Sequence, residues 1–138
     1  MPMVTINILS GRGEAYGQAV SDVVNQAVIE TMNFPEDDRY QVVNELPEYA
    51  LQIQQRQGER AIINLVMRGG RADEAKQAFY RRVVADLAVN PGIPPENVVI
   101  NFAENNDIDW SFANGKASFI EEPEKWSAVP PSANRHAA

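Results

Sequence analysis

The sequence contains one pattern of secondary structure twice, and this repeat restricts the fold more than any other feature. Residues 3–9, MVTINIL, and residues 39–46, RYQVVNEL, are β-branched runs that favour strands. Between them, apolar residues recur at i, i+3 and i+4 over about residues 14–32, which predicts an amphipathic helix. The first part of the chain is therefore predicted to be a β-α-β unit.

The same order returns in the second part of the chain. Strands are predicted at residues 60–67 and 98–104, with a helix at residues 72–89 between them. The halves also match in sequence, since INIL resembles INLV and PEDDRYQVVNE resembles PPENVVINFAE, at an offset of just under sixty residues. Two such segments indicate a duplicated β-α-β unit.

The duplication predicts a two-layer α+β fold. Parallel strands joined by a helix require a right-handed crossover, which places both helices on one face of a four-stranded sheet. The strands are apolar on both faces, so we expect a second subunit to cover the other face of the sheet.

We expect one domain over residues 1–122. It consists of the two units at about 2–46 and 60–104, and an aromatic segment at 105–122. The remaining residues, 123–138, form a proline-rich tail. Because prolines prevent a helix over the length of this tail, we expect it to be extended or disordered.

Composition excludes several partners and cofactors. A net charge of −7 and a pI near 4.7 argue against a nucleic-acid-binding protein, because phosphate contacts require a basic face. No apolar run approaches the roughly 20 residues that a membrane span needs. The chain has no cysteine, which is compatible with a cytoplasmic protein. We therefore expect a cytoplasmic protein with no nucleic-acid or membrane partner.

Conventional catalytic motifs are missing from the sequence. Without cysteine, and with His136 in the tail as the single histidine, neither a Ser-His-Asp nor a Cys-His arrangement is expected. We expect no metal and no cofactor. GRG at 11–13 and RGGR at 68–71 lack both nucleotide-binding fingerprints and are interpreted as turns that lead into helices. The remaining candidates are a proline behind Met1, an acidic loop, two arginines and a late aromatic cluster.

Pro2 directly follows the initiator methionine. Aminopeptidases generally remove an initiator methionine that precedes a small residue, which would leave Pro2 with a free secondary amine. Its position alone favours a simpler interpretation, because proline is tolerated as the first residue of a strand.

Four segments cover about residues 2–120 and read MPMVTINI, PEDDRYQVVNE, RGGRADEAKQAFY and ENNDIDWSFANGKASF. In this order they resemble the tautomerase superfamily, specifically its malonate semialdehyde decarboxylase-like branch. The resemblance implies a duplicated β-α-β fold, a homotrimer, a small carboxylate substrate and catalysis by the amino-terminal proline.

The resemblance also implies roles for individual residues. Pro2 matches the catalytic proline, and Asp38 matches the loop aspartate of the family. Arg68 and Arg71 match the arginines that hold a substrate carboxylate; the decarboxylase pattern is R-x-R, whereas this chain has R-x-x-R, and Arg71 is the closer match. The aromatic wall of the pocket is matched by Trp110, Phe112 and Phe119. Where the family closes its pocket with an aliphatic residue, this chain has EEPEK.

The charge state of Pro2 decides which reaction is expected. A free α-amino group has a reference pKa of about 7.7 to 8.0. Aromatic neighbours and Arg71 would lower the pKa of this amine, whereas a close Asp38 would raise it. A neutral amine would move a proton α to a carbonyl, which is tautomerisation of a 2-oxo acid such as phenylpyruvate. A cationic amine would assist decarboxylation of a 3-oxo acid such as malonate semialdehyde, the reaction that Asp38 favours.

Each candidate residue also has a purely structural interpretation. Asp38 could end a turn beside Pro35. The two arginines could be solvated, although cations before a helix N-terminus oppose its dipole and thus indicate an anion. The three aromatic residues could belong to the core or to an interface, and Arg39 and Tyr40 could bind substrate or only pack. A non-catalytic trimeric module of the same fold therefore stays open as a third function.

Overall fold

The computed structural model describes residues 2–126. Its strands and longer helices are β1 (Met3–Leu9), α1 (Glu14–Met32), β2 (Tyr40–Leu46), β3 (Ala61–Arg68), α2 (Asp73–Val89) and β4 (Val98–Asn105). Its short helical turns are η1 (Glu48–Ala50), η2 (Pro95–Asn97), η3 (Asp107–Asp109), α3 (Ser118–Glu121) and α4 (Pro123–Trp126). Each predicted strand and helix of the two β-α-β units is confirmed.

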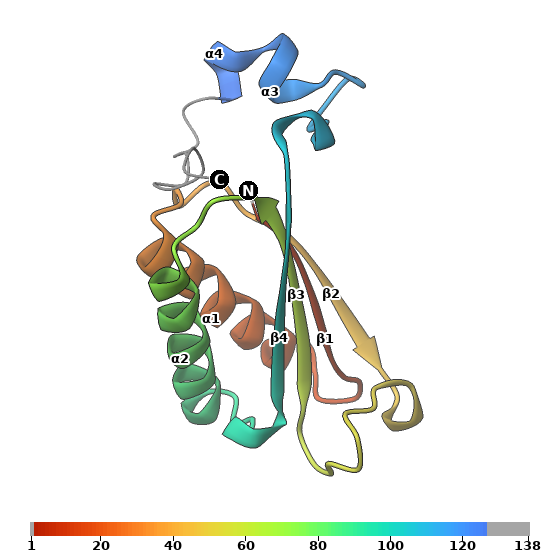
Figure 1. The fold of residues 1–138 in the computed structure, drawn as a ribbon. Coiled ribbons are helices and arrows are strands. Elements are labelled where there is room, and N and C mark those ends of the chain that lie inside the picture. The colour runs from red at the N-terminus through yellow and green to blue at the C-terminus, as the bar shows by residue number, and fades with distance from the viewer. Residues whose placement is uncertain (1, 127–138) are drawn as a thin grey trace.

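The four strands form one mixed sheet in the order β2-β1-β3-β4. Within each unit the strands are parallel, and the central strands β1 and β3 are antiparallel. Both helices lie on the same face of the sheet (Figure 1). The predicted two-layer α+β fold is therefore confirmed. No helix in the described part of the chain is long and apolar enough to cross a membrane.

Two asparagine pairs show that the halves are equivalent in register. Asn7 of β1 lies opposite Asn44 of β2, and Asn64 of β3 lies opposite Asn101 of β4. In each pair the second asparagine donates a side-chain hydrogen bond to the first, at 3.0 and 3.4 Å. Equivalent residues of the halves are therefore 57 positions apart.

The core lies between the sheet and the helices. Alternate residues of the central strands face the helices and are fully buried, because side chains alternate between the faces of a strand; they include Ile6, Ile8, Ile63 and Leu65. Helix residues at i, i+3 and i+4 spacing pack against them, including Val20, Val24, Val28, Phe79 and Val83.

The sheet face opposite the helices carries exposed apolar side chains. Met3 and Val42 are 38% and 51% exposed, beside the polar asparagine pairs. Within residues 2–126, no helix covers this face (Figure 1). Coverage by another subunit stays a prediction.

The segment after β4 departs from the sequence prediction at its end. The expectation of an extended or disordered chain from residue 123 is wrong for residues 123–126, which form α4. Proline is tolerated there because the first position of a helix needs no N–H donor. The indole of Trp126 stacks on Phe112 with ring centroids 4.6 Å apart. The rest of the predicted tail, including His136, lies outside the described residues.

Candidate active site

All four strands have an end at one end of the sheet, which we call the Pro2 end. The parallel strands β1 and β2 both begin there, with Met3 opposite Tyr40. The antiparallel strand β3 ends there, with Val66 opposite Met3. Pro2, directly before β1, is buried. This topology brings Pro2 together with the α1–β2 loop and the β3–α2 loop.

Asp38 lies in the α1–β2 loop. Its backbone N–H donates to the carbonyl of Pro35 at 3.2 Å, so the structural turn at this position is present. Its Oδ2 is shielded from solvent. The pKa of the Tyr40 phenol is raised, mainly by burial and further by the charge of Asp38. Asp38 is therefore both a turn residue and a shielded carboxylate at the Pro2 end.

Arg68 is the last residue of β3 and is buried. Its Nε donates to Oδ1 of Asp107 at 2.9 Å, and its guanidinium carbon lies 3.8 Å from the centre of the Phe119 ring. Arg68 therefore fixes the segment after β4 onto the end of β3. Within residues 2–126 its two terminal nitrogens donate no hydrogen bond to protein.

Arg71 lies in the loop between β3 and α2 and is half-buried. Its guanidinium carbon lies 4.1 Å from the centre of the Phe34 ring, and Nη1 donates to the carbonyl of Met32. Burial lowers the pKa of Arg71, and the nearby charge of Arg68 lowers it further. Two cations held close together and partly desolvated make this loop a favourable place for an anion.

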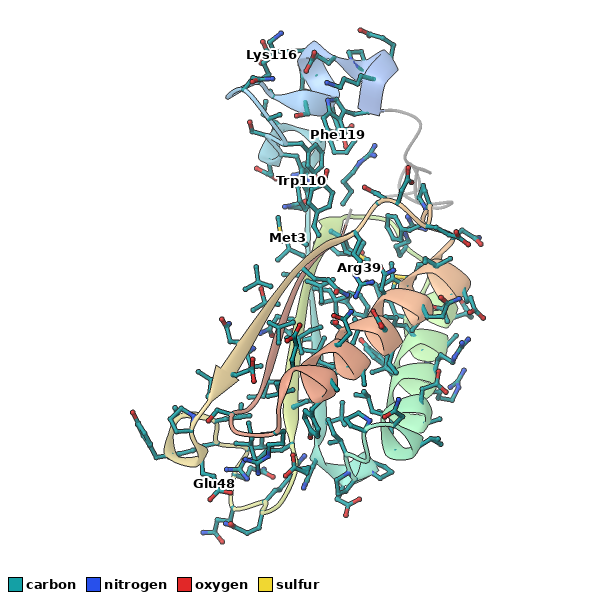
Figure 2. All side chains as sticks on the ribbon, turned by 180° about the vertical axis from the view of Figure 1, so that it is seen from behind. Met3, Arg39, Glu48, Trp110, Lys116 and Phe119 are labelled. Atoms are coloured by element: carbon teal, nitrogen blue, oxygen red, sulfur yellow. The ribbon has the colours of Figure 1, made fainter. Side chains whose placement is uncertain are left out.

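The aromatic residues after β4 form a cluster around Phe112. Trp110 stacks on it at 5.3 Å and Phe119 meets it edge-on at 5.4 Å. Tyr40 stacks on the same ring at 5.5 Å, which connects the cluster to β2. Figure 2 shows Trp110 and Phe119 beyond Met3, at the end of the molecule opposite Glu48.

The structure thus places the seven predicted site residues at the Pro2 end. They are Pro2, Asp38, Arg68, Arg71, Trp110, Phe112 and Phe119. The aromatic residues also have the structural role that the sequence allowed, since Trp110 and Phe119 belong to the core cluster. This arrangement can hold a carboxylate at the end of the sheet where Pro2 is buried.

The structure separates the roles of Arg39 and Tyr40, which the sequence left open. Arg39 donates to Asp22 at 2.9 Å and to the Ser21 hydroxyl at 3.3 Å, so it packs β2 against α1. Tyr40 packs in the aromatic cluster, beside Asp38.

Three further residues, not predicted from the sequence, contact the predicted ones: Phe34, Asp107 and Trp126. In the sequence, only the occurrence of an aromatic residue in an otherwise polar stretch could have indicated Phe34, in NFPEDD, and Trp126, in EEPEKW.

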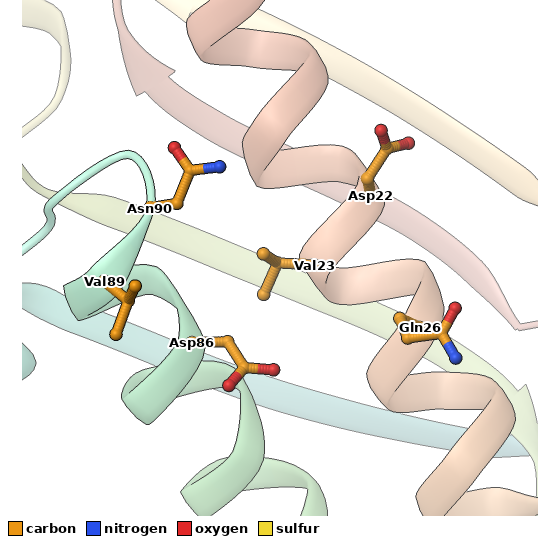
Figure 3. Close-up of a pocket in the computed structure, with 6 residues that line it drawn as sticks. All are labelled: Asp22, Val23, Gln26, Asp86, Val89 and Asn90. Carbon is orange, nitrogen blue, oxygen red and sulfur yellow. The ribbon is translucent and has the colours of Figure 1, made fainter.

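A separate groove lies between the two long helices (Figure 3). It is lined by Asp22, Val23, Gln26, Asp86, Val89 and Asn90. Its lining carries two carboxylates and no cation, so it does not suit a carboxylate substrate. Among the described residues, no group of three or more histidine or acidic side chains could hold a metal ion.

Comparison with known families agrees with this architecture. Two models described as tautomerase enzyme match the chain, one over residues 38–113 and the other over residues 2–57.

Individual relatives extend the match over nearly the whole chain. Probable tautomerase YusQ of Bacillus subtilis (strain 168) is 37% identical over 128 residues, which cover 88% of this chain and 100% of that protein. FG41 malonate semialdehyde decarboxylase, solved with 3-bromopropiolate as inhibitor, is 27% identical with a TM-score of 0.84, over 94% of this chain and 100% of that chain. A fused 4-OT, solved as a symmetric trimer, shares the fold with a TM-score of 0.73 at 19% identity, over 83% and 94% of the two chains. The chain therefore belongs to the tautomerase superfamily, in the branch that resembles malonate semialdehyde decarboxylase.

Proposed function

We propose that this superfamily member uses the amine of Pro2 to decarboxylate a short 3-oxo acid of the malonate semialdehyde type. The observation that carries the proposal is the placement of the shielded Asp38 carboxylate at the strand end where Pro2 is buried. A nearby carboxylate favours the protonated amine. The likeness to malonate semialdehyde decarboxylase supports the same reaction.

In this reaction the arginines hold the substrate carboxylate while the Pro2 ammonium donates a hydrogen bond to the 3-oxo oxygen. The bond between the carboxylate carbon and C2 breaks, carbon dioxide leaves, and the electron pair forms an enolate whose oxygen accepts a hydrogen bond from the ammonium. A proton then passes from the ammonium to C2, and solvent restores the proton on Pro2. Asp38 stabilises the cation or activates a water that adds to the carbonyl.

Keto-enol tautomerisation of a 2-oxo acid such as phenylpyruvate is the second candidate. It needs the same arginines and a neutral amine, and the relative named probable tautomerase favours it. A cytoplasmic location stays a prediction for either enzyme.

The proposal is tested on the purified protein by mass spectrometry and by assays with two substrates. We expect a chain without Met1 that releases carbon dioxide from malonate semialdehyde. Rapid ketonisation of enol-phenylpyruvate without decarboxylation would instead support the tautomerase. A chain that retains Met1 and acts on neither substrate would support the non-catalytic module.

Replacing Arg71 by alanine is expected to raise KM for carboxylate substrates by about 10- to 150-fold, since a charge-assisted contact contributes roughly 1.5 to 3 kcal/mol. Arg68→Ala should raise KM less, because the charge of Arg68 is already paired with the Asp107 carboxylate. Arg81→Ala, on the exposed face of α2, is the matched control and should leave KM unchanged. Steady-state kinetics measures all three, and an unchanged KM in Arg71→Ala would place the anion elsewhere.

We also propose that the protein is a homotrimer that covers the apolar face of its sheet. Sedimentation velocity at micromolar concentration should give a trimer. Val42→Asp should shift it toward monomer, because Val42 is 51% exposed on that face, while Val89→Asp, 85% exposed at the end of α2, should not. A stable wild-type monomer would contradict this assembly.

A further inference from the structure

The end of the sheet opposite the Pro2 end is its counterpart in the duplicated fold. Strands β3 and β4 begin there and β1 ends there. At the 57-residue offset of the halves, the position that corresponds to Pro2 is Glu59. The β1–α1 loop, which carries Arg12, corresponds to the β3–α2 loop, which follows Arg68 and carries Arg71.

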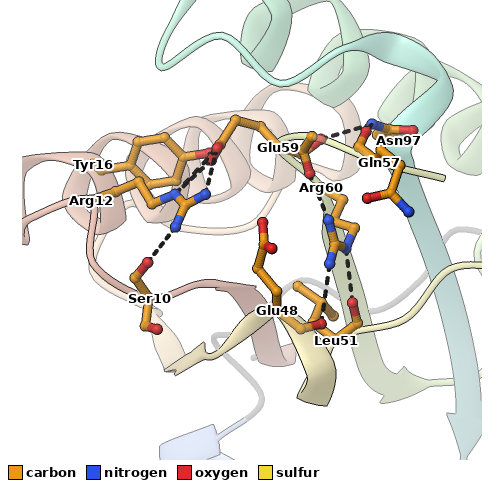
Figure 4. A network of polar contacts seen from close by, with 10 residues as sticks. Ser10, Arg12, Tyr16, Glu48, Leu51, Gln57, Glu59, Arg60 and Asn97 are labelled. Carbon is orange, nitrogen blue, oxygen red and sulfur yellow. Dashed lines mark hydrogen bonds and ion pairs between the residues drawn. The ribbon is translucent and has the colours of Figure 1, made fainter.

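Glu59 and Arg12 form a two-pronged ion pair at this end (Figure 4). Nε of Arg12 lies 3.1 Å from both carboxylate oxygens, and Nη2 lies 2.8 Å from Oε2. The Tyr16 hydroxyl donates to Oε1 at 2.5 Å. A guanidinium fork with one further donor is a common way to bind a carboxylate.

The positions of Arg12 and of the backbone around Glu59 do not depend on the Glu59 side chain. Nη1 of Arg12 donates to the carbonyl of Ser10 at 2.5 Å, which holds the guanidinium in place. The buried Arg60 donates to the carbonyls of Leu51 and Glu48, and Asn97 donates to that of Glu59 itself. The backbone around Glu59 is therefore fixed by groups other than its side chain.

At each end a β-α loop with an arginine lies at the same end of the sheet as one of the two equivalent positions, Pro2 or Glu59, but only Glu59 supplies a carboxylate. We propose that the Arg12–Tyr16 cluster is a second carboxylate-binding site, occupied by the protein's own Glu59, and that it accepts a small monocarboxylate when that side chain is removed. Acetate matches the carboxylate and the adjacent carbon of glutamate. The side chains of Arg12 and Glu59 are 30% and 29% exposed, so a small anion can reach the position from solvent.

Chemical rescue of Glu59→Ala tests this proposal. We expect the melting temperature of Glu59→Ala to fall by about 4 °C or more. Sodium acetate should restore about half of this loss, with an effect that saturates as the acetate concentration rises, whereas sodium chloride at equal ionic strength should not. Glu59→Gln is the matched control, because its amide still fills the site and should gain nothing specific from acetate. The double variant Arg12→Ala/Glu59→Ala should also lose the acetate effect.

An acetate effect in Glu59→Ala no larger than that in Glu59→Gln, or one that persists without Arg12, would overturn the proposal. If Glu59→Ala does not fold, Glu59→Ser gives the same comparison, since it also removes the carboxylate. Thermal stability is the readout, so the result is independent of whether the Pro2 end decarboxylates, tautomerises or does neither.

Discussion

Replacing Pro2 by alanine is expected to lower kcat/KM by at least about 100-fold, because a positioned acid or base contributes typically 10²- to 10⁴-fold. The pyrrolidine ring restricts rotation about the N–Cα bond and so fixes the direction of the amine, whereas the amine of alanine rotates freely. Alanine removes little core volume at this position, so the fold and the oligomer should survive. Steady-state kinetics and sedimentation velocity on the same preparation measure both.

A second change isolates the amine from the ring. An extra glycine inserted between Met1 and Pro2 keeps proline in place but converts its nitrogen into an amide, which can neither accept nor donate a proton near neutral pH. This variant should be at least as inactive as Pro2→Ala. Pro47→Ala, an exposed proline after β2, is the matched control. Wild-type rates in either Pro2 variant would rule out catalysis by the Pro2 amine.

Most of the fold follows from the sequence because its determinants are local. β-branched runs and i, i+3, i+4 spacing predict β1, α1, β3 and α2 directly. A parallel crossover of fixed hand then places both helices on one face. The duplication also relates the strand pairing of the two units, since the pair Asn7 and Asn44 recurs as Asn64 and Asn101 with the same side-chain hydrogen bond.

The candidate site depends partly on contacts between distant segments, which local patterns do not encode. The segment after β4 has no periodicity, so its packing through Asp107 on Arg68 could not be read from the sequence. Arg12 is a similar case: GRG is the predicted turn, but the ion pair of Arg12 joins it to Glu59, 47 residues along the chain. Candidate site residues could be assigned only where a resemblance supplied this long-range information.

Replacing Asp38 by asparagine is expected to separate the two candidate reactions. Decarboxylation should fall by about 100-fold or more, because the amide can neither stabilise the Pro2 cation nor activate water. Ketonisation of phenylpyruvate should be largely retained, since it needs only a neutral amine. Loss of the nearby negative charge also lowers the pKa of the amine, which increases its neutral fraction near pH 7.

The pH dependence gives the same separation in the unmodified protein. If the reactive form is the cation, decarboxylation should decline as pH rises through the pKa of the amine, whose reference value is about 8, whereas tautomerisation should rise over the same range. Asp37→Asn is the matched control, because this neighbouring aspartate is exposed, and it should change neither reaction. If the wild type tautomerises efficiently without decarboxylating, and Asp38→Asn leaves that rate and its pH profile unchanged, then Asp38 is a turn residue only. In that case the Pro2 end is the site of an isomerase, in which the amine acts as a base.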